Sequence, residues 1–302
     1  MNIQRVPDTP KMATPSPVRF QRTSGYGLVS SKLGAHGRSR IDRLFQEGAA
    51  RIRAPEPFDH QHLEAVLINT AGGLTGGDHI AWSATAGQNS TLSVTTQACE
   101  KVYKSTSGAA LVDVDLKVEA GSTLFWLPQE TILFDQAQLH RTIRANLAQD
   151  ATLLVIEGVI FGRKAMRESV KTGSWRDHWR IHHQGTLIHA ENVRLDGQIA
   201  EHLDNPAGLN GMTALATLAL FGNDVEKAAA HANAALKAHP AVSGGASAWH
   251  VDPGSKQGEK LIVRVAAQDG YDLRQALISL INAITHALSL KNPLGLPAVW
   301  ST

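Results

Sequence analysis

The chain has 302 residues, of which 43% are hydrophobic and 19% are charged, and its formal net charge is +2. This composition is typical of a globular protein with a sizeable core, and it excludes a disordered chain. Lysine and arginine are scattered, without a basic stripe of interleaved aromatics, which argues against nucleic-acid binding. The one cysteine, Cys99, excludes an intramolecular disulfide and a zinc site built from cysteines.

Residues 1–26 predict a flexible N-terminal tail. Proline, serine and threonine dominate this stretch, and it contains no apolar segment of the kind that a secretory signal needs. Elsewhere, no run approaches the roughly 20 apolar residues of a membrane-spanning helix. We therefore expect a cytoplasmic protein that does not associate with membranes.

Residues 27–205 predict a β-rich body. Between Val112 and Glu119, valine and leucine alternate with charged residues, which is typical of a half-buried strand. Further strands are expected at 63–69, 79–84, 90–96, 122–127, 138–146, 152–161, 174–183 and 186–195. Many short strands at roughly ten-residue spacing indicate a mainly β fold, which can be a sandwich, a barrel or a β-helix.

A glycine-rich loop stands between the first two of these strands. The sequence INTAGGLTGGDHI, at 68–80, places four glycines within six positions and then Asp78. Glycine permits backbone dihedrals that side chains forbid. The loop has no lysine to hold a phosphate and no nucleophile beside a base, so it predicts architecture rather than catalysis.

Residues 206–302 predict a helical layer over the β body, within one domain that covers 27–302. Helices are expected at Met212–Phe221, at Val225–His239 with a cap at Asn223 or Asp224, and at Leu273–Leu290. Asp272 and Gln275 would form a capping box for the last helix, which Asn292-Pro293 would end. A further strand is expected at Lys260–Ala267.

Three carboxylates are unusual for their surroundings. Glu157 has apolar neighbours on both faces of its strand, and a buried carboxylate must be paired, hydrogen-bonded or open to internal water. Glu191 shares a strand face with His189, Leu187, Val193 and Leu195, whereas Arg194 lies on the opposite face. Asp78 closes the glycine loop. Each can also be a purely structural group: Asp78 can bond loop amides, and Glu157 can pair with Arg163 or Arg180.

Histidine is abundant, with 14 residues that include His60, His62, His79, His178, His182, His183 and His189. His189 and Glu191 are two residues apart on one strand face and form the pair best placed to share a metal ion. Imidazole suits nickel, and carboxylate oxygen is acceptable. The spacing matches no closed metal site, so weak or transient coordination is the more credible prediction.

Enzymatic alternatives have little support. The sequence has no GxSxG motif and no GxxxxGK[ST] motif, and Cys99 has no catalytic context beyond the nearby Lys101. A pair of acids drawn from Glu130, Asp135 and Glu157 would suit a β-helix polysaccharide hydrolase or lyase. Their spacing does not favour that interpretation, which remains the main alternative.

Six segments, in order, resemble the UreD (UreH) family of urease accessory proteins. They are KLGAHGRSRIDRLFQEGAARI, LINTAGGLTGGD, TTQACEKVYKS, LPQETILFDQAQLHRTI, LLVIEGVIFGRKAMRE and WRIHHQGTLIHAENVRL. The closing LKNPLGLPAVWST is also similar to that family's tail, so the resemblance covers about 27–302. Cys99 stands where the family usually has a small residue and Lys104 where it has arginine, but neither touches the core motifs.

The resemblance implies a fold and a function. It implies a stacked, β-helix-like sheet body with a C-terminal helical layer, and a urease maturation chaperone rather than an enzyme. Such a protein would be a scaffold on apo-urease that works with UreF and the GTPase UreG in GTP-dependent nickel insertion. UreF would meet the helical layer. A plain assembly adaptor without a nickel role remains a second alternative.

The resemblance also implies what the carboxylates do. Nickel would pass through the β body, with Asp78, Glu157, His189 and Glu191 lining a water-filled conduit and Arg194 as a neighbouring charge. Ligands in a conduit should be weak and multiple, because the ion must leave as well as enter. We therefore expect no tightly bound cofactor, only nickel in transit.

Overall fold

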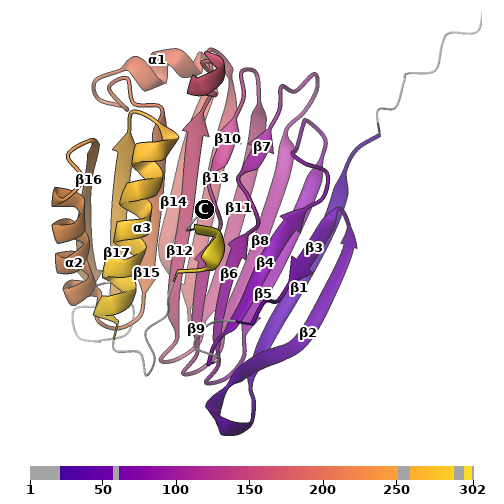
Figure 1. Ribbon diagram of the computed structural model, residues 1–302, viewed down its shortest axis with the longest axis vertical. Helices are drawn as coiled ribbons and strands as arrows, with labels where there is room; N and C mark the ends of the chain where they lie inside the picture. The colour runs from indigo at the N-terminus through magenta and orange to yellow at the C-terminus, as the bar shows by residue number, and fades with distance from the viewer. Residues whose placement is uncertain (1–20, 57–60, 251–258, 289–295, 301–302) are drawn as a thin grey trace, which may run out of the picture.

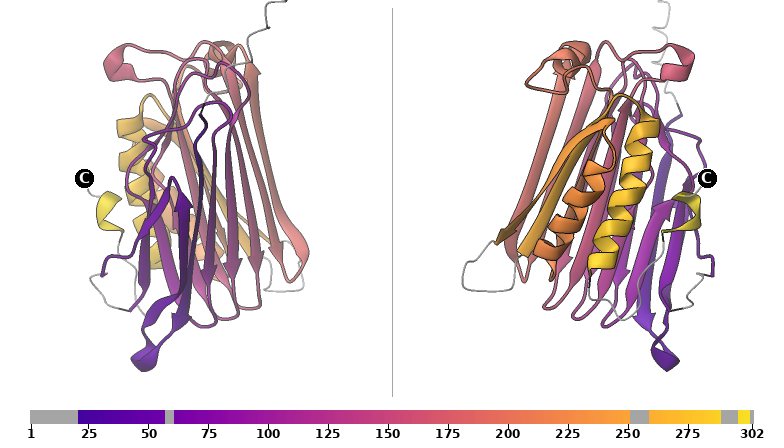
Figure 2. Two further views of the ribbon diagram at one scale, coloured as in Figure 1. Left: turned by 90° about the vertical axis from the view of Figure 1, so that its right-hand side faces the viewer. Right: turned by 60° about the vertical axis from the view of Figure 1, so that its left-hand side comes forward.

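Two stacked β-sheets form the body of the protein, and two helices cover the outer face of one sheet (Figures 1 and 2). The computed structural model describes residues 21–56, 61–250, 259–288 and 296–300. The expected mainly β fold with stacked sheets and a C-terminal helical layer is confirmed. Among the helices of these residues, none combines the length and the apolar character needed to cross a membrane.

The seven-stranded sheet has the order β14-β13-β11-β8-β5-β1-β2. Its strands are β1 (Ser24–Leu33), β2 (Ser39–Gly48), β5 (His79–Ala86), β8 (Ala110–Val118), β11 (Gln138–Leu147), β13 (Gly173–His183) and β14 (Thr186–Gly197). The strands from β1 to β13 are parallel neighbours, whereas β2 and β14 pair antiparallel at the two ends.

The second sheet has ten strands, in the order β16-β17-β15-β12-β9-β6-β4-β3, with β10 and β7 continuing from β12. Its strands are β3 (Ala50–Arg53), β4 (Leu63–Asn69), β6 (Thr91–Thr96), β7 (Glu100–Val102), β9 (Thr123–Leu127), β10 (Thr131–Leu133), β12 (Thr152–Phe161), β15 (Ala214–Phe221), β16 (Val242–His250) and β17 (Glu259–Ala267). From β4 to β13 the chain crosses repeatedly between the sheets, which makes the neighbours within each sheet parallel.

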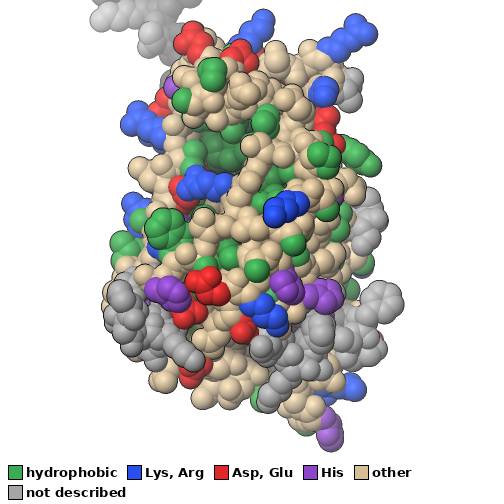
Figure 3. Space-filling view, turned by 90° about the vertical axis from the view of Figure 1, so that its left-hand side faces the viewer, with side chains coloured by type: hydrophobic (Ala, Val, Ile, Leu, Met, Phe, Trp, Pro, Cys, Tyr) green, Lys and Arg blue, Asp and Glu red, His purple; other side chains and the backbone are tan. Residues whose placement is uncertain are grey.

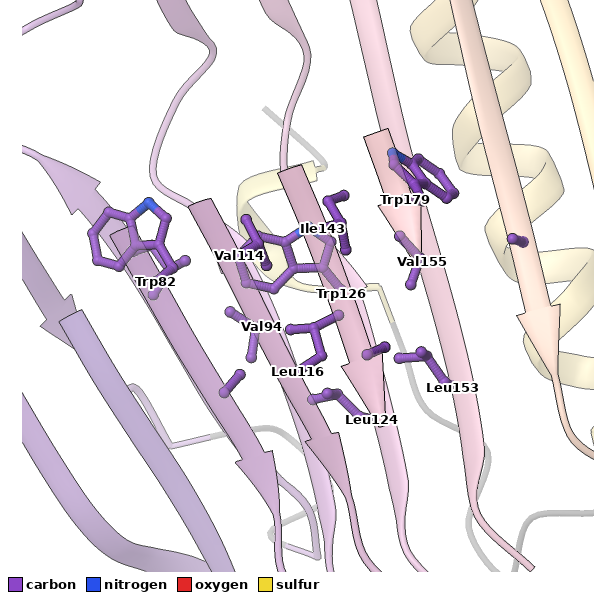
Figure 4. Packing of buried hydrophobic residues seen from close by; sticks show 14 of the residues in the cluster. Trp82, Val94, Val114, Leu116, Leu124, Trp126, Ile143, Leu153, Val155 and Trp179 are labelled. Carbon is purple, nitrogen blue, oxygen red and sulfur yellow. The ribbon is translucent and has the colours of Figure 1, made fainter. Parts of the chain in front are cut away.

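The main core lies between the sheets, because the alternating residues of each strand send one side chain in two inward. In the seven-stranded sheet, one row of register partners contains Trp82, Val114, Ile143 and Trp179. Residues such as Trp126 and Val155 of the ten-stranded sheet face this row (Figure 4). The strand alternation in the sequence therefore becomes a continuous apolar layer.

A second apolar cluster lies under the helices α2 (Val225–Lys237) and α3 (Gly270–Ala287), on the outer face of the ten-stranded sheet. Leu273, Leu277 and Leu280 of α3 are fully buried there, at the spacing of one helix face. Short helical segments complete the chain: α1 (Ile199–Asp204) and the 3₁₀ turns η1 (Ala35–Gly37), η2 (Lys164–Met166) and η3 (Ala298–Trp300).

The C-terminal third differs from the prediction in one element. The segment expected as a helix at Met212–Phe221 is strand β15, which lies between β12 and β17 with both faces covered. A continuous apolar run does not distinguish a buried strand from a buried helix, and burial on both faces removed the alternation. Strands β1, β2, β3, β7, β10 and β16 were also not among the predicted ranges.

The two remaining helices are confirmed. The cap of α3 differs from the prediction, whereas the N-cap residue of α2 is one of the two predicted. Asp269, rather than the predicted pair Asp272 and Gln275, caps α3 by accepting hydrogen bonds from the amides of Tyr271 and Asp272. Asp224 is the N-cap residue of α2 in left-handed conformation, without a side-chain capping bond. The predicted stop at 292–293 lies outside the described residues.

Candidate functional site

Three charged side chains meet inside the apolar layer between the sheets. Glu157 points inward from β12, and Arg141 and Asp177 point inward from β11 and β13 of the facing sheet. The three residues are 6%, 4% and 3% exposed. Arg141 and Asp177 are direct register partners on neighbouring parallel strands. The strand order therefore brings an arginine beside one carboxylate and across from the other.

Arg141 bridges the two carboxylates. One terminal guanidinium nitrogen donates to Glu157 and the other to Asp177. Each carboxylate also accepts an indole N–H: Trp126 Nε1 lies 3.0 Å from Glu157 Oε1, and Trp179 Nε1 lies 2.9 Å from Asp177 Oδ1. We call the group Glu157, Arg141 and Asp177 the interlayer triad.

The partner of Glu157 is not one of the two arginines that the sequence suggested. Arg163 lies past the end of β12 and bonds Glu168. Arg180 donates to backbone carbonyls. Arg141 takes the place of both, because its position in β11 is an inward one between Leu139 and Ile143.

The interlayer triad carries one positive and two negative charges when both acids are ionised, which leaves a net charge of −1. Burial, which outweighs the attraction of Arg141, raises the pKa of Glu157 to about 7, and the charge of Asp177 adds to this rise. Burial also opposes the charged form of Arg141, but the two carboxylates outweigh it and raise the pKa of the guanidinium. Arg141 is therefore a permanent cation.

A cavity of about 50 Å³ lies against the interlayer triad. Its polar lining includes Arg141, Glu157, Thr96, Glu100 and Gln129, and apolar side chains such as Trp82 and Leu139 complete it. A cavity of this size with polar partners can hold water. Burial raises the pKa of Glu100, whose carboxylate accepts hydrogen bonds from Asn69 Nδ2 at 3.1 and 3.2 Å. Polar groups therefore extend from the triad toward β7.

Glu191 and His189 lie near the other end of the interior, on β14. Glu191 is buried and pairs with Arg264 of β17 at 2.5 Å, a contact that joins the two sheets. His189 packs between the rings of Trp179 and Phe221. A β-bulge after Ile181 breaks the alternation, so Leu187, predicted on the same face, is instead exposed.

The imidazole of His189 is held neutral. Burial, with the charge of Lys260 as a second cause, lowers the pKa of His189 to about 4, while Glu191 opposes the shift. Among the residues that the structure describes, the buried Nε2 atom of His189 has no hydrogen-bond partner. A neutral imidazole with a free nitrogen beside a carboxylate is chemically suited to a divalent transition metal.

Asp78 bonds backbone amides around its loop, as the structural interpretation of this residue predicted. Its two carboxylate oxygens accept the backbone amides of Thr23 and Thr75, each at 2.8 Å. The glycines make this loop possible: a Cβ at Gly76 would lie 1.9 Å from the Ser105 hydroxyl. Asp78 thus lies in the loop before β5, whereas Glu157 and Glu191 lie within strands.

Of the remaining predicted residues, Arg194 and His79 lie at the surface, His178, His182 and His183 are half-buried, and His62 is buried. Arg194 lies on the outer face of β14, as predicted, and bonds Asp196. His79 pairs with Asp113 at 2.9 Å, and His60 lies outside the described residues. Within the described ranges, no group of three or more His, Cys, Asp or Glu residues is placed to hold a metal ion.

The acids proposed for a hydrolase do not form a pair. Glu130 lies on the outer face of the ten-stranded sheet, where it pairs with Arg274 of α3 at 2.7 Å and its Cγ approaches Gly158. Glu157 points to the opposite, inner face, and Asp135 accepts the amides of Lys171 and Thr172. The three carboxyl groups therefore do not face one common substrate position.

Sequence reasoning missed Arg141 and Asp177. A signal was available: Arg141 lies between Leu139 and Ile143, and Asp177 lies between Trp175 and Trp179, so each occupies an inward position of its strand. The same alternation that singled out Glu191 would have placed both in the interior.

Comparison with known proteins gives a consistent result. A family model described as UreD urease accessory protein matches residues 27–301. A protein named urease accessory protein UreD from Agrobacterium fabrum is 47% identical over 285 residues, which cover 94% of this chain and 93% of that relative. Proteins of the same name from Rhizobium etli and Mesorhizobium japonicum are 46% and 44% identical, with 94% and 97% of this chain covered and 97% and 99% of the relatives.

Proposed function

The chain belongs to the UreD family of urease accessory proteins, and on that premise we propose that it is a scaffold on apo-urease that conducts nickel between its two sheets. Its family gives it a role in urease maturation, as an accessory protein rather than as the catalytic enzyme. The further steps concern the route of the metal and the partners that supply it.

The observation that carries the nickel proposal is the row of buried charges between the sheets. Buried ion pairs contribute little net stability, and apolar residues of similar volume often replace them without loss. Stability therefore does not explain why Glu157, Asp177 and Glu191 stand in an otherwise apolar layer. Passage of a cation does explain them, since carboxylates at intervals offer weak, successive sites.

The proposed path runs from the cavity at Glu100 and Gln129, past Glu157, to His189 and Glu191. Trp179 connects the interlayer triad to His189, because its indole N–H donates to Asp177 and its ring lies against the imidazole. Asp78 is a candidate ligand where the path would reach the glycine-rich loop before β5. Arg194 contributes a neighbouring charge outside the path. Nickel is cargo in this scheme, with no tightly bound cofactor.

We place the exit of the path at the side of the sheets where β14 faces β17. Glu191 and Arg264 belong to β14 and β17, near the ends of their respective sheets. Figure 3 shows this side of the molecule, where the surface is hollowed and carries side chains of both charge signs together with histidines. A mixed surface of this kind suits a transient protein partner better than a lipid or nucleic acid.

The partners in the proposal are apo-urease, a UreF-like accessory protein and a UreG-like GTPase. The sequence lacks a GxxxxGK[ST] motif, so GTP hydrolysis would be the task of the GTPase. The layer of α2 and α3 is the proposed contact for the UreF-like protein. Exposed Tyr271 on α3 offers an aromatic side chain there.

Co-expression with apo-urease and the two accessory partners tests the proposal. Nickel-dependent urease activity should require this chain, and Glu157→Gln should lower that activity at limiting nickel while the complex still assembles. Glu119→Gln is the matched control, because Glu119 pairs with Lys117 at the surface. Full activation by Glu157→Gln would exclude the conduit role of that residue. Loss of activation only where the complex weakens would instead support a plain adaptor.

A further inference from the structure

Arg141 places a positive charge on the path that a cation would take through this interior. It is a permanent cation, almost fully buried, and its guanidinium lies between carboxylates of the two facing sheets. Both Glu157 oxygens accept a donor, one from Trp126 and one from Arg141. Asp177 is occupied in the same way by Trp179 and Arg141. An incoming divalent cation therefore meets a positive charge where it needs a ligand.

We propose that Arg141 is a displaceable counter-cation that keeps the interior closed and sets how weakly it holds a divalent transition-metal ion. The inference rests on the proposed function and adds the residue that controls passage. Arg141 is a positioning residue here: it acts on the metal by occupying Glu157 and Asp177. When a cation enters, the guanidinium leaves Glu157, and when the cation departs, it returns.

The surroundings of Arg141 allow this movement. The cavity of about 50 Å³ lies against its guanidinium, and the Nε atom has no hydrogen-bond partner among the described residues. Glu100 lines the same cavity, so a displaced guanidinium can turn toward a third carboxylate, past a lining that also contains apolar side chains such as Trp82 and Leu139. Thr131 Oγ1, at 3.5 Å, is already its neighbour on that side.

Arginine is better suited to this role than lysine. Its planar guanidinium donates to two carboxylates at once, whereas an ammonium group is a compact point charge on a flexible stem. A single residue can hold carboxylates of both sheets together only if its side chain, like the guanidinium of Arg141, donates in two directions. Metal and guanidinium then compete for the same oxygens, which couples their binding by a factor on the order of ten.

Nickel binding to the full chain, co-purified with its accessory partner, tests the proposal by equilibrium dialysis with radioactive nickel. Arg141→Gln should bind nickel about tenfold more tightly than the wild type, and the gain should disappear in Arg141→Gln with Glu157→Gln. Arg176→Gln is the matched control, since Arg176 pairs with Asp196 on the outer face of β13. Folded Arg141→Gln with wild-type affinity would overturn the proposal.

If Arg141→Gln does not fold, Arg141→Lys keeps the charge but cannot bridge both carboxylates, and it should show a smaller gain in nickel affinity. Unchanged affinity in folded Arg141→Lys would then overturn the proposal. Wild-type fluorescence gives an independent measurement, because nickel at Glu157 should quench Trp126, and the quenching should be lost in Trp126→Phe.

These measurements separate the inference from the function beneath it. Quenching of Trp126 in the wild type, together with unchanged affinity in the Arg141 variants, contradicts the closing role of Arg141 and leaves the conduit intact. Absence of quenching and of nickel binding in the wild type and in both Arg141 variants contradicts the conduit itself, and the closing role with it.

Discussion

The indole N–H of Trp126 donates to Glu157 Oε1 over 3.0 Å, so a side chain that fills the apolar core also fixes its buried carboxylate. The two residues lie on β9 and β12, which are parallel neighbours in the ten-stranded sheet. A large ring with one polar atom meets both demands at once, since its body packs and its N–H finds a partner. The position is therefore more constrained than its apolar surroundings suggest.

Trp126→Phe tests this double role. Phenylalanine keeps most of the packing but removes the donor, and a hydrogen bond to a charged group contributes about 1.5–3 kcal/mol. We expect the free energy of unfolding in urea at pH 8, where Glu157 is mainly ionised, to fall by about that amount. Trp249→Phe, at an exposed position, should change it by less than about 0.5 kcal/mol. Equal losses in the two variants would contradict the role of the indole bond.

Glu157 predicts a pH dependence of stability. Its pKa is about 7 in the folded state against an ordinary value of 4.5, so the folded protein binds the extra proton. The associated stability is fully present below pH 4.5 and is lost as the pH rises through 7.

The comparison of wild type with Glu157→Gln isolates this contribution. Urea unfolding between pH 4.5 and 8, in the presence of a chelator, should show the wild type losing stability relative to the variant as the pH rises. Absolute stabilities are not the test, because the variant also changes the bond to Arg141. Parallel pH profiles would show that Glu157 titrates at its ordinary pKa.

His189 predicts the opposite dependence. Its folded pKa of about 4 lies below the ordinary value of 6.5, so its contribution is present above pH 6.5 and is lost as the pH falls through 4. His189→Gln, which cannot take up a proton, should therefore be less sensitive to acid in the same urea series. His286→Gln is the control on an exposed histidine. If acid lowers the free energy of unfolding of the wild type no more than that of His189→Gln, the imidazole is exposed to water and its pKa is not lowered.

The strands that line the interior were largely predictable, whereas the pairing of charges was not. Glu157 stood out because apolar residues flank it on both faces, and its strand was predicted at the observed bounds, 152–161. Its partner Arg141 is 16 residues earlier and comes from the other sheet. Only the stacking and register of the two sheets bring them together, and strand periodicity contains neither.

The misassigned segment at 212–221 has a related cause. Alanine and leucine are good helix formers, and the run lacks the alternation of a half-buried strand. Its strand identity comes from its neighbours, because β12 and β17 pair with it on both edges and α3 covers it. Tertiary context therefore decides the structure of β15.

Glu130 and Arg274 predict a large stability effect under α3. The carboxylate of Glu130 is 1% exposed, and removal of one partner from a buried ion pair costs about 3–5 kcal/mol. Glu130→Ala should show that loss in urea unfolding, whereas Lys117→Ala at the surface pair with Glu119 should cost less than about 1 kcal/mol. A comparably small loss in Glu130→Ala would mean that water reaches the pair.

Cys99 should be an unreactive thiol in the folded protein. Burial, with the charge of Glu130 as a second cause, raises its pKa to about 11, while Arg274 opposes the shift. Thiolate is the reactive form, so alkylation by iodoacetamide at pH 8 should be far slower than in urea. Glu130→Gln removes one cause of the raised pKa and, if still folded, should speed the reaction. Equal rates in folded and unfolded protein would show that the segment before β7 opens readily. Such opening would also expose the cavity beside the interlayer triad, because Glu100, which lines that cavity, directly follows Cys99.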